Sequence, residues 1–174
     1  MSLALPGAVR GVVTCAFALW LVRFDVARRL VSKTGAPRFT ALTLLSGYAW
    51  LFVSGVLVAR YADVVAGPAY DAATHAFFLG FVVAMVFGHA PTILPAVARV
   101  PLPFHRVFYA HVALLHAGLV LRVAGDVIGD ARLRAWGGMA NAAAIVLFAT
   151  VTAGRSLHVQ RKDRRLRAVA RGDA

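Results

Sequence analysis

Five of the six histidines in this chain fall in two consecutive apolar stretches. The first, "HAFFLGFVVAMVFGHAP" (residues 75–91), carries His75 and His89 with no charged residue between them. The second, "HRVFYAHVALLH" (residues 105–116), carries His105, His111 and His116. Imidazole side chains bind metal ions, transfer protons and form hydrogen bonds. Which of these applies depends on the solvent around the two stretches.

The composition indicates that this solvent is a lipid bilayer. Of the 174 residues, 60% are apolar and only 15% are charged, and the mean hydropathy is +0.74. Soluble domains carry about 25% charged residues. The apolar residues form blocks of nearly the length that crosses a bilayer, about 20 residues. We therefore expect an all-α integral membrane helical bundle with five transmembrane helices. The predicted spans cover about residues 5–24, 41–59, 72–91, 104–124 and 136–154.

The limits of the third span follow from local signals. Asp71 is a plausible N-cap, and Pro91 with the following "TILPAVARVPLP" is expected to end the helix. Residues 1–154 would form one transmembrane domain, and residues 155–174 a basic, solvated cytoplasmic tail. The single cysteine, Cys15, excludes an intramolecular disulfide, and no Cys-x-x-Cys-His motif for covalent haem attachment occurs.

The positive charges indicate an orientation. Fourteen of the 19 Lys and Arg residues fall in the predicted segments 23–40, 92–106 and 155–174, which lie on one side of a five-span protein. Cytoplasmic segments are enriched in Lys and Arg. The sequence thus predicts an outside N-terminus and a cytoplasmic C-terminus, in the plasma (inner) membrane of a bacterium. The net charge of +12 is explained by this bias and predicts no nucleic-acid partner.

Ideal helix geometry pairs the histidines by depth. His75 and His89 lie about 40° out of register and about 21 Å apart along one helix, and His105 and His116 lie about 20° and about 16 Å apart on the next. In antiparallel helices this places His89 with His105 near the cytoplasmic edge, and His75 with His116 in the outer half. His111 points about 140° away from His116 and is an alternative inner ligand. The choice between His105 and His111 stays open.

Two histidines at one depth suit a b-type haem better than zinc, because a structural zinc site usually needs four clustered ligands. One or two haems b are expected. A copper ion that accompanies the haem is also possible if His89, His105 and His111 converge. Haem propionates need cationic partners, for which arginine is suited. The candidates are Arg99 and Arg106 on the inner side and Arg60 and Arg122 on the outer side.

Small residues recur at every fourth position beside the first histidine pair, at Ala76, Gly80, Ala84 and Gly88. Such a ridge is typical of close helix packing in membranes, and it would also leave room for a flat macrocycle. The ridge alone favours packing.

The stretches "DAATHAFFLGFVVAMVFGHAPTILPAV", "FYAHVALLHAGLVLRVAGD" and "RAWGGMANAAAIVLFATVTA" resemble small bacterial membrane proteins related to the haem–copper oxidase subunit I and NnrS-type group. The resemblance covers about residues 71–153 and is strongest at the His-x13-His-x-Pro pattern. It implies haem or copper binding at His75 and His89, and next at His116. Large oxidase subunits have about a dozen spans, so oxygen reduction by this five-span chain does not follow.

The leading hypothesis is a membrane protein that binds b-type haem and takes part in electron transfer or small-gas chemistry. If it is an enzyme, it is an oxidoreductase subunit. Its expected partners are the lipid bilayer and a redox partner subunit or quinone. The patch "GGMANAAA" is an internal contact or a contact within a homo-oligomer. The alternatives are a cofactor-free membrane interaction subunit, in which the histidines join helices, and a small metal or proton transporter.

Overall fold

The computed structural model describes residues 6–62, 64–99 and 101–171, without the side chains of Ala98 and of residues 163–171. Every regular element in this part of the chain is helical. The elements are α1 (Gly7–Phe24), α2 (Ala27–Leu30), α3 (Ala36–Arg60), α4 (Pro68–His75), η1 (Ala76–Val83), α5 (Ala84–Ala98), α6 (Phe108–Ile128) and α7 (Ala131–Arg171).

The described chain contains five helices that are long and apolar enough to cross a membrane. They cover Gly7–Phe24, Ala36–Arg60, Pro68–Val97, Phe108–Ile128 and Ala131–Lys162. This confirms the predicted all-helical fold with five candidate spans. The first was predicted from residue 5, which lies outside the described residues; the second is longer than predicted at its N-terminal end.

The third span is one continuous helical segment made of α4, η1 and α5. It begins at Pro68 after Gly67, whose φ of 87° favours glycine, so the prediction of Asp71 as the N-cap is wrong. The prediction that Pro91 ends the helix is also wrong, because α5 continues through Pro91 and Pro95 to Ala98. Neighbouring Thr side chains can bind backbone carbonyls near such prolines. Here the Thr40 hydroxyl donates to the carbonyl oxygen of Gly88 at 2.8 Å.

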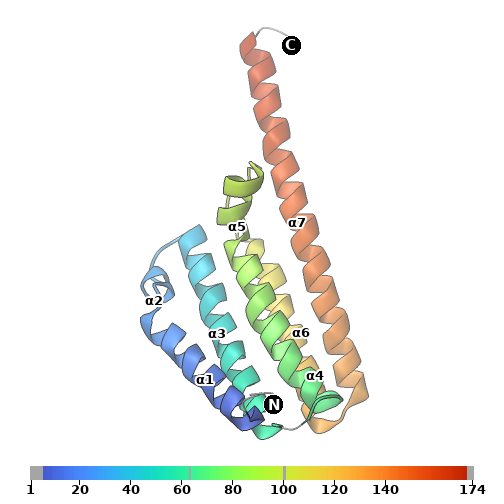
Figure 1. Cartoon of the computed structure of the whole chain (residues 1–174). Helices are drawn as coiled ribbons and strands as arrows, with labels where there is room; N and C mark the ends of the chain where they lie inside the picture. Colours follow the sequence, from blue (N-terminus) through green and yellow to red (C-terminus); the bar gives the residue numbers. More distant parts are fainter. Residues whose placement is uncertain (1–5, 63, 100, 172–174) are drawn as a thin grey trace, which may run out of the picture.

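The last two spans also differ from their predicted limits. α6 begins at Phe108 rather than at residue 104, because residues 101–105 form an irregular segment that contains two prolines. α7 begins at Ala131 and remains helical to Arg171, so the predicted tail continues the fifth helix as far as that residue. In Figure 1, α7 extends well beyond the other helices at the C-terminal end.

The helices form a row in which the third span lies between α3 and α6 (Figure 1). α1 packs on the outer side of α3, and α7 packs on the outer side of α6. α1 can approach α3 closely because glycines meet at their contact: a Cβ on Gly11 would lie 2.6 Å from the Gly55 carbonyl oxygen. The helices at the ends of the row, α1 and α7, expose large apolar side chains, among them Phe17, Trp20 and Trp136.

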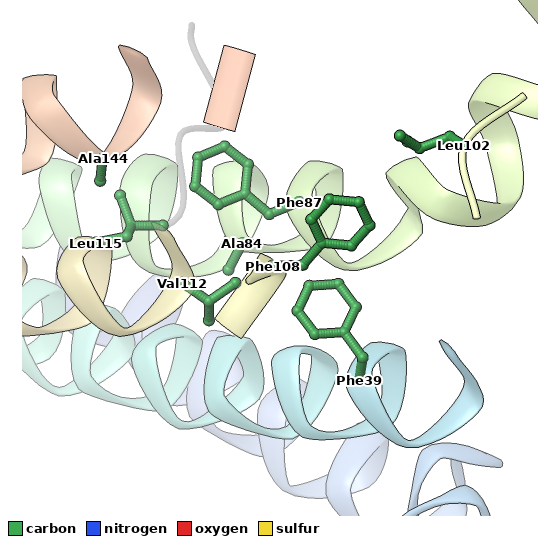
Figure 2. Packing of buried hydrophobic residues seen from close by; sticks show 8 residues of the cluster. All are labelled: Phe39, Ala84, Phe87, Leu102, Phe108, Val112, Leu115 and Ala144. Atoms are coloured by element: carbon green, nitrogen blue, oxygen red, sulfur yellow. The ribbon is translucent and has the colours of Figure 1, made fainter. Parts of the chain in front are cut away.

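The main core lies where α3, α5, α6 and α7 meet. Figure 2 shows Phe39 of α3, Phe87 of α5 and Phe108 of α6 with their rings close together, and Ala144 of α7 beyond them. These four side chains are at most 2% exposed. The core therefore joins the two candidate histidine helices to α3 and α7, and His111 lies inside it.

Candidate functional site

His111 is the most deeply buried of the described histidines. It is 1% exposed, and neither of its ring nitrogens has a hydrogen-bond partner among the described residues. Four phenylalanine rings surround it, with centroids 4.8 Å (Phe87), 5.2 Å (Phe148), 5.9 Å (Phe108) and 6.4 Å (Phe39) away. Burying a polar group without a hydrogen bond costs about 1–3 kcal/mol in protein mutational data. His111 is therefore an isolated polar group in an aromatic cage.

His89 lies at the edge of the same region, and one of its ring nitrogens has no hydrogen-bond partner among the described residues. Its Nδ1 lies 2.9 Å from the carbonyl oxygen of Met85. A carbonyl oxygen only accepts, so Nδ1 carries the proton and Nε2 keeps its lone pair. His89 lines an apolar groove of about 560 Å³ between α5 and Phe148 of α7. Phe148 thus packs on His111 and also forms a wall of the groove.

His75 has the same tautomer but different neighbours. Its Nδ1 lies 2.7 Å from the carbonyl oxygen of Asp71, which leaves Nε2 free for another partner. It lies near the buried carboxylate of Asp126 on α6, which is 5% exposed. The guanidinium of Arg134 on α7 is 3.5 Å from that carboxylate, and Arg122 also acts on it electrostatically. His75 therefore belongs to a polar cluster at the end of the bundle where α4 begins.

His116 has protein partners for both ring nitrogens. The indole N–H of Trp50 donates to Nδ1 at 3.0 Å, so Nδ1 is unprotonated. Nε2 then carries the proton and donates to the Ser46 hydroxyl at 2.9 Å. The Ser46 hydroxyl in turn donates to the carbonyl of Thr43 at 2.9 Å. These contacts join α6 to α3 and hold His116 as a neutral imidazole.

The histidines that the depth argument paired thus have different hydrogen-bond partners in the structure. His105 is exposed in the segment before α6, where its Nδ1 accepts the backbone N–H of Val107 at 3.2 Å. His111, rather than His105, lies beside the region of His89. No group of three or more His, Cys, Asp or Glu residues suited to a metal ion occurs among the described residues. The three inner histidines expected for copper are therefore not gathered in this structure.

The four arginines proposed for haem propionates also differ in environment. Arg60 is exposed at the end of α3, with its guanidinium carbon 5.4 Å from the Tyr61 ring centroid. Arg99 and Arg106 are exposed in the connection between α5 and α6. Arg122 is half-buried, and its Nε has no hydrogen-bond partner within the described part of the chain. Among the described residues, the structure records no direct contact between any of these four arginines and a histidine.

The small-residue ridge is a packing surface. A Cβ on Gly80 would overlap Cβ and Cγ of Trp50, and a Cβ on Gly88 would lie 3.0 Å from Cβ of Thr43. Ala76 and Ala84 are fully buried. Side chains of α3 thus occupy much of the space along the ridge, which confirms the packing interpretation and leaves no clearance for a macrocycle there.

Two residues of the His116 network were not predicted as functional. Ser46 and Trp50 are four residues apart on α3, and residues at this spacing share a helix face. A hydroxyl and an indole N–H on one face of an apolar span are a signal for an interhelical partner. The phenylalanine cage of His111 had no such signal, because phenylalanine is common throughout this chain.

Comparison with known proteins identifies a family without a described function. Residues 2–157 match the family described as Domain of unknown function (DUF8744). Neither a curated protein nor a solved structure matches the chain. Because the family match extends over most of the sequence, this protein belongs to the DUF8744 family.

Proposed function

We propose that this protein is a multi-pass membrane protein that binds b-type haem through His89 and His111 and takes part in electron transfer. One observation carries the proposal: an imidazole in the core, His111, has two unpartnered nitrogens and shares Phe148 with the groove of His89. Two other candidates fit less well, because His116 has two hydrogen-bond partners and His105 is exposed.

The donor set fits a haem iron chemically. The Nδ1 atom of His89 donates to a backbone carbonyl, which is the arrangement typical of metal-binding histidines, since it orients the ring and leaves Nε2 for the metal. His111 has no competing partner for either nitrogen among the described residues. Binding a metal would remove the desolvation cost of one His111 nitrogen. Neutral imidazole is a common ligand for haem iron.

The surroundings fit the porphyrin as well. The groove beside His89 is large, at about 560 Å³, and its other lining side chains are apolar, including Met85, Ile93 and Phe148. Cofactor pockets are mostly apolar with a few placed polar groups. Arg99 and Arg106, exposed between α5 and α6, are the cations available to propionates at this end. A bound haem would supply one-electron exchange, and the protein residues would bind it and exclude water.

The membrane setting is part of the proposal. Five helices are long and apolar enough to span a bilayer, and the Lys and Arg residues concentrate in segments on one side. These features support insertion in a bacterial inner membrane with the C-terminus in the cytoplasm. His89 and the Arg-containing connection that follows α5 would then lie toward the cytoplasmic side.

The test is the visible spectrum of the protein purified in mild detergent and titrated with haem. The proposal predicts a Soret band that is lost in His89→Ala and in His111→Ala. His105→Ala and His158→Ala are matched controls, because both histidines are exposed, and both variants should keep the band. Thermal unfolding of each variant would separate lost binding from lost folding.

A protein that binds no haem, or a band that persists in both His89→Ala and His111→Ala, would refute the proposal. His111→Phe provides a further check. If His111 only fills the aromatic cage, replacing its unpartnered nitrogens with carbon should raise the melting temperature. If it is a ligand, the same variant should lose the haem spectrum.

The hydrogen bonds of His116 favour a second candidate function, a cofactor-free interaction subunit. Through its contacts to Ser46 and Trp50, at least one half-buried histidine of this chain joins two helices. A colourless protein that co-purifies with another membrane protein, unaffected by His89→Ala, would support this alternative over haem binding.

A further inference from the structure

A second cavity opens at the opposite end of the bundle from the α5–α6 connection. It has a volume of about 320 Å³ and lies where α1 begins, α3 ends and α4 begins. Its lining comes from these three helices, from η1 and from the segment that joins α3 to α4. None of the histidines lines it, so it is distinct from the proposed haem site.

Close backbone contacts hold the α1 wall of this cavity in place. Gly7 lies against the backbone of Ala62, and Gly11 lies against the backbone of Ala59. Any larger residue at either glycine would push α1 away from α3. Arg10 lies between these two contacts along α1 and lines the cavity. Its position beside the cavity therefore follows from the packing of α1 rather than from a free N-terminal segment.

Several residues that line the cavity carry hydrogen-bond donors. The guanidinium of Arg10 and the hydroxyls of Tyr61, Tyr70 and Thr74 belong to lining residues. A second guanidinium, that of Arg60, lies over the Tyr61 ring with its central carbon 5.4 Å from the ring centroid. These residues offer positive charge and neutral donors, which is the chemistry that binds a phosphate or carboxylate.

Other residues of the lining are apolar. Leu57, Val58, Phe77 and Phe78 are among them, and Phe78 is 55% exposed. Phe17, two helical turns beyond Arg10 on α1, is 49% exposed. A ligand of this cavity therefore needs a polar, anionic end and an apolar part that can lie along exposed helix surface.

We propose that this cavity binds the phosphate headgroup of an anionic phospholipid. Charge complementarity favours this occupant: the phosphate meets Arg10, with Tyr61 and Tyr70 as neutral donors, and the acyl chains lie against Phe78 and the exposed face of α1. Arginine and tyrosine near the end of a transmembrane helix commonly lie at the level of lipid headgroups, where such a ligand is available. The cavity adds to that general tendency a defined place for one headgroup.

The experiment is native mass spectrometry of the detergent-purified protein titrated with phosphatidylglycerol or with phosphatidylcholine. The wild type should retain phosphatidylglycerol at least about tenfold more tightly than phosphatidylcholine. Arg10→Ala should lose that preference, because hydrogen bonds to charged groups contribute about 1.5–3 kcal/mol, or roughly ten- to a hundredfold in affinity. Arg10→Lys should keep part of the preference, since it retains the charge but not the bidentate geometry.

Arg132→Ala is the matched control. Arg132 is an exposed arginine at the start of α7, at the same end of the bundle, and it does not line the cavity. This variant should bind phosphatidylglycerol as the wild type does. Equal losses of phosphatidylglycerol binding in Arg10→Ala and Arg132→Ala, or equal binding of the two lipids by the wild type, would each overturn the proposal.

The headgroup site can still be tested if the Arg10→Ala variant does not fold. If Arg10→Ala is unstable, Tyr70→Phe removes one donor from an exposed side chain without changing charge or packing volume. It should weaken phosphatidylglycerol binding measurably, and an unchanged affinity in Tyr70→Phe would count against the headgroup site.

Discussion

The hydrogen bond between Trp50 and His116 should couple these two residues energetically. The Trp50 indole N–H donates to His116 Nδ1 at 3.0 Å, and the two rings are nearly parallel, with an interplanar angle of 15°. Trp50→Phe removes the N–H but keeps an aromatic ring. His116→Ala removes this bond and the bond to Ser46, which is 2.9 Å long. A double-mutant cycle isolates the contact between Trp50 and His116.

The expected magnitudes follow from this count of bonds. Interhelical hydrogen bonds in membrane proteins contribute about 0.6 kcal/mol on average and about 1.7 kcal/mol at most. Trp50→Phe should therefore cost about 1 kcal/mol. His116→Ala should cost about 2–4 kcal/mol, because it breaks two bonds and leaves a cavity. The double variant should show a coupling energy of about 1 kcal/mol.

The measurement is the free energy of unfolding in mixed micelles titrated with a denaturing detergent. Trp20→Phe is the control, since Trp20 is 55% exposed on α1 and distant from His116 in the helix order. Its effect should add to that of His116→Ala. If the Trp50 and His116 effects also add to within about 0.3 kcal/mol, the hydrogen bond between them does not stabilise the fold.

Two further predictions concern packing and charge. Gly80→Ala should lower the free energy of unfolding by about 1–3 kcal/mol, because its Cβ would overlap Trp50. Gly154→Ala, with no atom within 4 Å of the new Cβ, should be neutral or stabilising by up to about 1 kcal/mol. Thermal melts in detergent compare the two variants, and equal effects would contradict the packing argument. Arg134→Ala should destabilise the protein by about 1–3 kcal/mol, because it leaves the buried Asp126 carboxylate without its nearest cation. Adding Asp126→Asn should recover most of this loss of stability. No recovery in the double variant would show that Arg134 acts through other contacts.

The number and type of helices were predictable because they depend on local properties of the chain. Long apolar blocks separated by charged segments require helices in a bilayer, where each backbone polar group must find a partner within its own segment. All five spans were found on this basis. Their limits were less predictable, as Pro91 shows. A proline normally ends a helix, but α5 continues past it beside the Thr40 hydroxyl, which belongs to another helix.

The angular premise for pairing the histidines does not hold in the structure. An unbroken α-helix was expected from His75 to His89, but Ala76–Val83 forms a π-helix, in which hydrogen bonds join residues i and i+5. The rotation per residue therefore differs over most of that interval. On the other side of the predicted pair, His105 lies before the first residue of α6. The rotation between His105 and His116 therefore cannot be calculated from α-helix geometry.

The apolar composition, the five spans and the concentration of histidines in two of them follow from the sequence alone, because hydropathy and helix formation depend on neighbouring residues. The roles open to each histidine depend on side chains from other helices. Only the folded bundle gives His116 its partners on α3, encloses His111 in phenylalanine rings from three other helix segments, and leaves His89 beside a groove. Burial and hydrogen bonding between distant segments decide which imidazole nitrogens remain free, and no spacing within one helix contains that information.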